Sequence, residues 1–119
     1  MDSVGPLQLR VMKYIWKNGP STVNQVHESL NGEPGAQKLA YTTILTVMRN
    51  LAKREILDQQ SGRRSHVFSP LVDQQTYTSE MLAALRRDLF GNDIKKMLQF
   101  MAGDKRLSPA ARKRIAKSL

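Results

Sequence analysis

Three threonines stand close together in one segment of the chain, at Thr42, Thr43 and Thr46. Threonine is a mediocre helix former, because its β-branched side chain loses rotamer freedom in a helix, so three within two turns need a reason. Each hydroxyl can donate and accept hydrogen bonds, and each methyl group can make an apolar contact. Short side chains of this kind let another molecule approach closely, and they suit the polar and methyl groups on DNA base edges.

Cationic and amide side chains accompany the threonines. Arg49, Asn50 and Lys53 fall on the polar side of the same segment, and Lys38 stands just before it. A Ser-Gly-Arg-Arg turn at residues 61–64 supplies two more cations. Lysine and arginine bind phosphate oxygens, which fix a protein on a duplex without reading its sequence. The predicted DNA-contact residues are Lys38, Thr42, Thr43, Thr46, Arg49, Asn50, Lys53, Arg63 and Arg64.

The charge of the whole chain agrees with a polyanionic partner. Its 119 residues include 19 lysines and arginines against 10 acidic residues, a formal net charge of +9. Such an excess attracts polyanions, of which nucleic acid is the commonest in a cytoplasm. A protein partner with an acidic face, or a charged surface that serves solubility alone, would also explain this positive excess.

Other chemistries find little support. The chain has no cysteine, which excludes disulfides, thiolate metal sites and a cysteine nucleophile, and His27 and His66 stand too far apart to suggest zinc. We expect no metal, no cofactor and no enzyme activity, since Asp88 and Asp93 beside a turn are typical of helix capping. The sequence contains no membrane-length apolar run and no signal peptide at its N-terminus, so we expect a cytoplasmic protein without a membrane partner.

Hydrophobic periodicity predicts the elements that hold the threonines. A helix over residues 40–54 has its apolar residues on one face, at Ala40, Ile44, Val47, Met48 and Leu51. Two helices precede it, at residues 6–17 and over about eight residues after an N-cap at Ser21 or Thr22, with a loop at residues 31–35. Two strands follow, at residues 56–60 and 65–69, joined by the basic turn as a β-hairpin.

The remaining residues read as three helices with sparse apolar stripes. These begin at residues 73, 94 and 109. They are too poor in apolar residues to form a core alone, so we expect them to pack against a second copy of the chain. The predicted dimerisation residues are Tyr77, Met81, Leu82, Leu85, Leu89, Ile94, Met97, Leu98, Met101 and Ile115. The predicted division is a DNA-binding domain at residues 1–71 and a helical dimerisation region at residues 72–119.

Three helices followed by a strand, a basic turn and a strand form a winged helix-turn-helix. The predicted class is therefore mostly α with a small β-hairpin (α+β). In this fold, a helix enters the major groove of double-stranded DNA and the hairpin tip follows the backbone. A winged-helix module that binds RNA or protein, without a specific operator, is the alternative, and the basic run at residues 112–117 is its main support.

Four stretches carry motifs at characteristic spacings. A helix ending in Trp is followed by Gly-Pro-x-Thr-Val within residues 12–23, and Ala-Tyr-Thr-Thr opens residues 40–51. Ser-Pro-Leu-Val occupies residues 69–72, and Leu-Phe-Gly at residues 89–91 precedes Leu-Ser at residues 107–108. With these motifs the sequence resembles the BlaI/MecI/CopY penicillinase-repressor family of winged-helix proteins.

The resemblance implies a homodimeric repressor of a beta-lactam-resistance-type or other stress operon, bound to a palindromic operator and held together by its C-terminal helices. In the antibiotic-responsive branch, a sensor-dependent protease cleaves an Asn-Phe bond in that region. Gln99 and Phe100 stand at the matching place, with Gln in place of Asn. The copper-responsive branch uses a cysteine-rich C-terminus, which this chain lacks.

Overall fold

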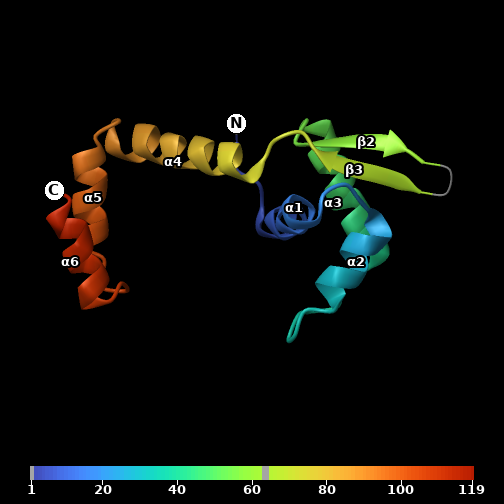
Figure 1. Ribbon diagram of the computed structural model, residues 1–119, viewed down its shortest axis with the longest axis horizontal. Helices are drawn as coiled ribbons and strands as arrows, with labels where there is room; N and C mark the ends of the chain where they lie inside the picture. Colours follow the sequence, from blue (N-terminus) through green and yellow to red (C-terminus); the bar gives the residue numbers. More distant parts are fainter. Residues whose placement is uncertain (1, 63–64) are drawn as a thin grey trace. The chain divides into compact units, whose positions relative to one another are not determined.

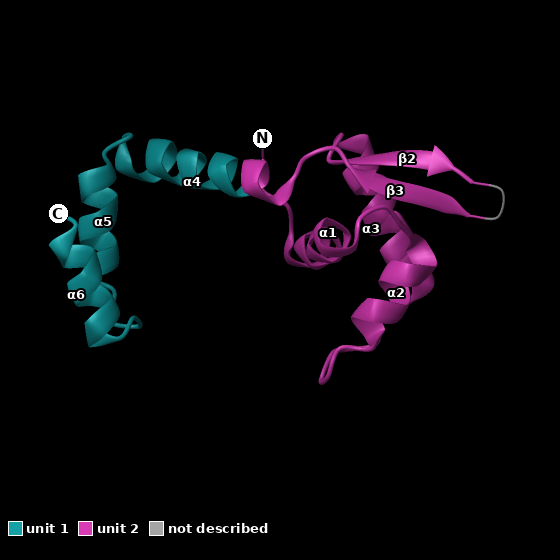
Figure 2. Cartoon of the chain, in the orientation of Figure 1, with its two compact units in different colours: residues 1, 78–119 teal, residues 2–77 magenta. Residues whose placement is uncertain are grey.

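The computed structural model describes residues 2–62 and 65–119, so the predicted contacts of Arg63 and Arg64 lie outside the described residues. Its elements, drawn in Figure 1, are α1 (Pro6–Asn18), β1 (Ser21–Thr22), α2 (Val23–Asn31), α3 (Tyr41–Lys53), β2 (Leu57–Ser61), β3 (His66–Pro70), α4 (Gln74–Phe90), α5 (Ile94–Ala102) and α6 (Pro109–Lys117). They form two compact units, at residues 2–77 and residues 78–119 (Figure 2). The division falls after Tyr77, whereas the sequence suggested residue 71.

The ends of α1 and α2 follow local rules. Pro6 occupies the first turn of α1, where its missing N–H costs nothing, and Gly19 ends the helix at a φ of 81° that favours glycine. Thr22 caps α2, since its hydroxyl accepts from the Gln25 N–H at 3.2 Å while the Gln25 side chain accepts from the Thr22 N–H at 2.9 Å. This reciprocal capping box sets the start of α2.

The sheet has three strands rather than the two of the predicted hairpin. Its order is β1-β3-β2, with both pairings antiparallel, and Ser21 of β1 lies opposite Phe68. The hairpin pairs Leu57 with Pro70 and Ser61 with His66, one residue beyond the predicted strand ends. A strand of two residues has no periodicity to detect, so the sequence indicated only a helix cap at this place.

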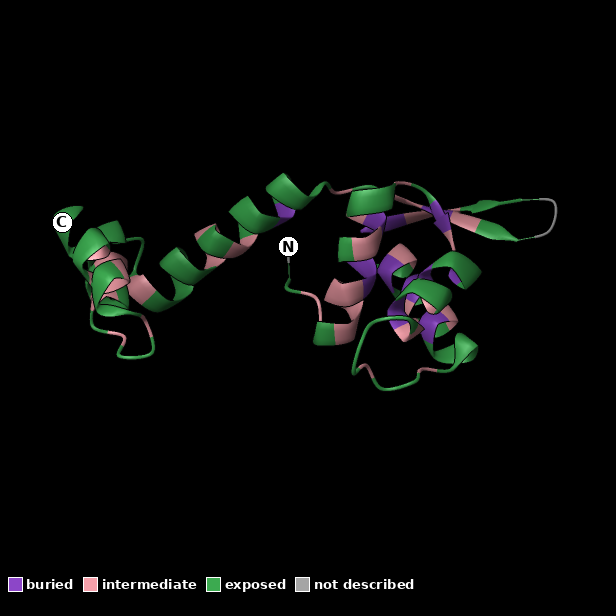
Figure 3. Ribbon diagram, turned by 60° about the horizontal axis from the view of Figure 1, so that its bottom comes forward, coloured by how far each residue is buried: buried purple, intermediate pink, exposed green. Residues whose placement is uncertain are grey.

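The core lies within residues 2–77 (Figure 3). Apolar residues of α1, α2, α3 and both hairpin strands form one buried cluster. The largest of its fully buried side chains are Phe68, Met12, Ile15, Leu30, Ile44, Met48, Leu51 and Leu57. This cluster anchors α3 against α1 and α2, as a helix-turn-helix requires.

Tyr77, which the sequence analysis placed among the dimerisation residues, packs within the unit of residues 2–77. Its side chain is only 9% exposed, and its ring centroid lies 5.5 Å from that of Trp16. The Tyr77 hydroxyl accepts a hydrogen bond from the Val4 N–H at 3.0 Å, and the Trp16 indole N–H donates to the Val72 carbonyl at 2.8 Å. These contacts attach residues 72–77 to α1 and to the N-terminal segment.

Residues 78–119 form a unit in which α5 and α6 pack together. Asp93 caps α5 by accepting from the Lys95 and Lys96 N–H groups, and Ser108 caps α6 by accepting from the Ala111 N–H. Neither α5 nor α6 has a fully buried residue. Among the helices of the described ranges, none combines the length and the apolar character needed to cross a membrane.

Candidate nucleic-acid interface

One face of α3 collects the six helical residues predicted to contact DNA. At about 100° per residue, they fall within an arc of about 120°, in the order Arg49, Thr42, Lys53, Thr46, Asn50, Thr43. All six are exposed. The opposite face carries Ile44, Met48 and Leu51, each fully buried. The buried face holds α3 on the core and leaves the polar face free for a ligand.

The N-terminus of α3 has no side-chain cap. Its N-cap is Ala40, whose side chain has no atom to accept a hydrogen bond from the first-turn N–H groups, and no acidic residue lies in the first turn. The Ala40 carbonyl accepts the Thr43 N–H at 3.1 Å. The N-terminus of a helix carries a partial positive charge and attracts anions such as phosphate. The end of α3 nearest Thr42 and Thr43 therefore favours an anionic partner.

The threonine hydroxyls do not all have the same freedom. The Thr46 hydroxyl donates to the Thr42 carbonyl one turn earlier, at 2.9 Å. In this conformation Thr46 can still accept a hydrogen bond, and its methyl group stays available for an apolar contact. The Thr43 hydroxyl has no partner within the described residues, so it can both donate and accept.

The lysine and arginine side chains of the candidate interface also differ in whether they have a local partner. Arg49 and Lys53 make no ion pair with any residue that the structure describes, and both are exposed. The Lys38 ammonium lies 3.3 Å from the Asn31 carbonyl at the end of α2, an interaction that favours a helix C-terminus. Lys38 therefore has a local partner, while Arg49 and Lys53 have their charges free for phosphate.

Two residues of α2 position the start of α3. The Asn31 side chain accepts from the Leu39 N–H at 2.8 Å and donates to the Leu39 carbonyl at 3.0 Å. The His27 Nε2 atom lies 2.8 Å from the same carbonyl, and its ring meets that of Tyr41 edge to face at 5.8 Å. The residue directly before the α3 N-cap is therefore attached to α2.

Sequence reasoning missed this positioning role. Asn31 was expected to open a loop but closes α2, and no periodicity signals an asparagine that binds a backbone eight residues later. Arg54 was also missed. Its guanidinium donates to the Asp2 carbonyl at 2.9 Å and to the Gln8 side chain at 3.2 Å, which attaches the N-terminal segment to the end of α3.

The wing begins at Gly62, where only glycine fits. A Cβ there would lie 2.3 Å from the Ser65 carbonyl oxygen, which accepts the Gly62 N–H at 3.0 Å. The strands that lead to this turn are β2 and β3, and their outer residues Ser61 and His66 are exposed. The phosphate contacts of Arg63 and Arg64 stay predictions from the sequence.

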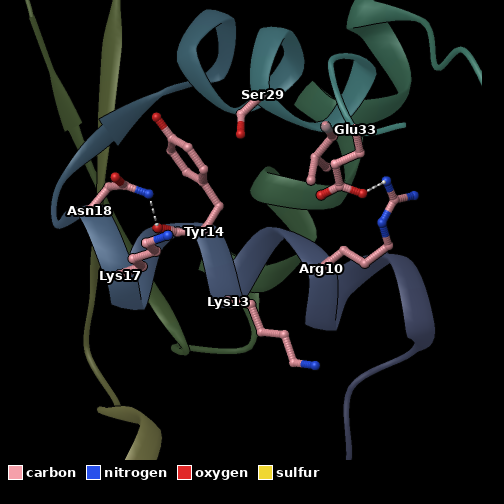
Figure 4. Close-up of a pocket in the computed structure, with 8 residues that line it drawn as sticks. Arg10, Lys13, Tyr14, Lys17, Asn18, Ser29 and Glu33 are labelled. Atoms are coloured by element: carbon pink, nitrogen blue, oxygen red, sulfur yellow. Dashed lines mark hydrogen bonds and ion pairs between the residues drawn. The ribbon is translucent and has the colours of Figure 1, made fainter. Parts of the chain in front are cut away.

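Elsewhere in this unit, an open groove of about 530 Å³ separates α1 from α2 (Figure 4). Arg10 and Glu33 form an ion pair across it at 2.7 Å, and Tyr14 and Ser29 line its wall. The groove includes none of the predicted DNA-contact residues. Across the described ranges, histidine and acidic side chains nowhere gather into a group that could hold a metal ion.

The predicted dimerisation residues of the other unit are partly uncovered. Leu82, Leu85, Leu89, Ile94 and Met101 are exposed, while Met81, Met97, Leu98 and Ile115 are half-buried. Gln99 and Phe100 lie inside α5, and the Phe100 side chain is 76% exposed.

Comparison with known proteins agrees with this geometry. The sequence model of a family described as "Penicillinase repressor" matches residues 4–119. The chain belongs to the penicillinase repressor family. The resemblance stated from the motifs is thereby confirmed.

The relatives of this penicillinase repressor family member align with different shares of the chain. The "Transcriptional regulator BlaI" of Mycobacterium tuberculosis (strain CDC 1551 / Oshkosh) is 39% identical over 72 residues, which are 60% of this chain. That match spans about half (50%) of the relative's own length. The "Penicillinase repressor" of Bacillus licheniformis is 24% identical over 105 residues, 87% of this chain and 80% of the relative.

A solved structure supports the fold of this family member. The solution structure of the DNA binding domain of the repressor BlaI is similar with a TM-score of 0.55 and 28% identity. The match covers 63% of this chain and 88% of that domain. The predicted winged helix-turn-helix and mostly α class are thereby confirmed.

Proposed function

We propose that the chain is a transcriptional repressor that reads double-stranded DNA with the exposed face of α3. One observation carries the proposal: six polar residues share an exposed arc of a helix whose other face is buried. A helix of this kind fits the major groove, where hydroxyls, amides and methyl groups distinguish base pairs. The similarity to the DNA binding domain of the repressor BlaI supports it further.

The roles within this face follow from its chemistry. Thr42, Thr43, Thr46 and Asn50 are placed to contact base edges. Arg49 and Lys53 neutralise phosphates, as we expect Lys38 and the wing residues Arg63 and Arg64 to do. The proposed activity is binding alone, without catalysis and without a cofactor.

Selection of bound sequences from a random duplex library, at near-physiological salt, tests this function. We expect an inverted repeat to be enriched, because a homodimer places two α3 helices on two half-sites. The variant Thr43→Ala/Thr46→Ala should reduce discrimination between the selected site and other duplexes, at about 1–3 kcal/mol per lost base contact. Thr78→Ala, at an exposed position of α4, is the control. Enrichment of no sequence would refute the repressor and favour an RNA-binding or protein-interaction module.

A second part of the proposal is a homodimer formed by residues 78–119. Leu82, Leu85 and Leu89 form one exposed stripe of α4 at helical spacing, and Leu89 is 69% exposed. Burial of a leucine side chain contributes about 1.5–3 kcal/mol, so a stripe left in water is costly unless a second copy covers it. In sedimentation of the full chain, Leu89→Ser should weaken association and Gln75→Ser, at an exposed position of the same helix, should not. A monomeric wild type would refute the dimer.

The third part concerns release from DNA. We propose the Gln99–Phe100 bond as a cleavage site for a sensor-dependent protease. The bond lies within α5, so a protease needs this helix to unwind locally. Mass spectrometry of chains recovered from induced cells tests it, and intact chains after full derepression would exclude this route.

A further inference from the structure

The positive charge of the chain is concentrated outside the winged-helix unit. Residues 78–119 carry ten lysines and arginines against four acidic residues, a net charge of +6. Residues 2–77 carry nine against six, a net charge of +3. The candidate interface on α3 and the wing therefore leaves most of the net charge without a role.

Ion pairs within residues 78–119 neutralise little of this charge. Arg87 pairs with Asp88 at 2.8 Å, and Arg106 pairs with Asp104 at 2.9 Å. Of the other two acidic residues, Asp93 is engaged as the cap of α5. Eight cations have no ion pair within the described residues: Arg86, Lys95, Lys96, Lys105, Arg112, Lys113, Arg114 and Lys117. All of these except the half-buried Arg112 are exposed.

Three of these cations form one face of α6. Lys113, Arg114 and Lys117 lie within an arc of about 100°, which we call the basic face of α6. Ala111 and Ile115, which are half-buried, lie on the other side of this helix, and α6 packs on α5. Lys113 and Lys117 are one turn apart, about 6 Å along the helix axis, so the basic face presents a short row of like charges to solvent.

Helix stabilisation accounts for only part of the positive charge on residues 78–119. Arg114 and Lys117 lie in the last turn of α6, where cations interact favourably with the helix dipole. Lys95 and Lys96, however, lie in the first turn of α5, where the dipole disfavours cations. Like charges on one small unit also repel each other. A bound polyanion would reduce the repulsion between these like charges.

We propose that the basic face of α6 binds the phosphate backbone of duplex DNA without reading its sequence. Duplex DNA carries one negative charge per about 1.7 Å of its axis, and each neutralised phosphate releases condensed counterions. Cations on an open helix face recognise phosphates and not base edges. This surface is separate from α3 and does not depend on the proposed operator. In the proposed homodimer, two such units add their charges and strengthen the attraction.

The salt dependence of binding to a long random-sequence duplex tests the proposal on the full chain. The double variant Lys113→Gln/Lys117→Gln removes two free charges, and Arg87→Gln/Arg106→Gln removes two charges that are engaged in ion pairs. The slope of log K against log salt changes by about 0.9 per phosphate contact. We expect the α6 variant to lower the slope by about 1.8 per chain and the matched control to lower it by less than half as much.

Two results would overturn the proposal. An α6 variant with the wild-type slope would show that these cations do not contact DNA, and the basic face would then serve another partner or solubility alone. Equal reductions in both double variants would show that only net charge matters. Far-ultraviolet circular dichroism and sedimentation confirm that both variants keep their helices and association state.

The outcome is distinguishable from failure of the proposed function. The sequence preference selected from a duplex library depends on α3 and is measured separately from the slope. If the library selection enriches no operator but the α6 variant has a lower salt slope, the α6 inference stands and the proposed repressor function is refuted. If the selection enriches an operator but the α6 variant keeps the wild-type salt slope, the repressor function stands and the α6 inference is refuted.

Discussion

The substitution Asn31→Ala tests how α3 is positioned. It removes the two hydrogen bonds, at 2.8 and 3.0 Å, that join the Asn31 side chain to the Leu39 backbone. Each such bond contributes about 0.5–1.5 kcal/mol net, because it replaces hydrogen bonds to water. The higher helix propensity of alanine offsets about 0.5 kcal/mol of this loss in the free energy of unfolding. We therefore expect a loss of about 0.5–2.5 kcal/mol in the free energy of unfolding.

Denaturant unfolding monitored by tryptophan fluorescence measures this loss. Trp16 is the single tryptophan of the chain and lies within the unit of residues 2–77, so the signal reports that unit. For a unit of this size, each 1 kcal/mol lowers Tm by roughly 4–8 °C. Asn24→Ala is the matched control, since Asn24 is exposed on the same helix and its side chain has no hydrogen bond within the described residues.

Equal stabilities of the two variants would refute the reasoning. Solvent would then replace both hydrogen bonds without cost, and Asn31 would have no part in holding the segment before α3. A stability loss confined to Asn31→Ala, in contrast, would show that α2 supports α3, the helix that we propose reads DNA. The expected control value lies within about 0.5 kcal/mol of the wild type.

Three further predictions concern other parts of the chain. Tyr77→Phe keeps the ring against Trp16 but leaves the Val4 N–H without its acceptor, so unfolding should become easier by about 1–2 kcal/mol, and an unchanged denaturation midpoint would contradict the role of the hydroxyl. Glu55 follows α3 with a φ of 60°, so Glu55→Gly should raise stability by about 0.5–1 kcal/mol, whereas Glu55→Ala, which keeps the Cβ, should give no such gain in the same assay. The hydrogen bond from the Arg106 side chain lowers the pKa of Asp104, so the carboxylate stabilises the α5–α6 turn above the ordinary aspartate pKa, and this contribution is lost as the pH falls through the lowered value. Helix content followed by circular dichroism should therefore fall on acidification more in the wild type than in Asp104→Asn, and identical acid titrations would contradict this assignment.

Much of the fold could be predicted because it is locally encoded. The period of 3.6 residues brings Thr42, Thr46, Arg49, Asn50 and Lys53 to one side of a helix in any environment. Pro6, Gly19 and Gly62 mark a helix start, a helix end and a tight turn through their own backbone preferences. These signals predicted all six helices and the hairpin, with differences of one or two residues at their ends.

The candidate site could be predicted only in part. The exposed face of α3 follows from periodicity, but its attachment through His27 and Asn31 joins residues 8 and 12 positions apart with no repeating pattern. Whether a threonine hydroxyl is free or bonded to the preceding turn also depends on its rotamer. The sequence therefore indicated which residues face outward, while the structure showed how they are held.

The sequence by itself determined the element order, the polar and apolar faces of α3, and the basic run at residues 112–117. Tertiary structure decided that Ser21 and Thr22 join β3 as a third strand, and that Tyr77 completes the winged-helix unit. The physical reason is distance along the chain. Helix faces and turns depend on neighbours a few residues away, whereas the Tyr77 hydroxyl meets a backbone N–H that lies 73 positions earlier. Such a contact forms only when the whole unit folds.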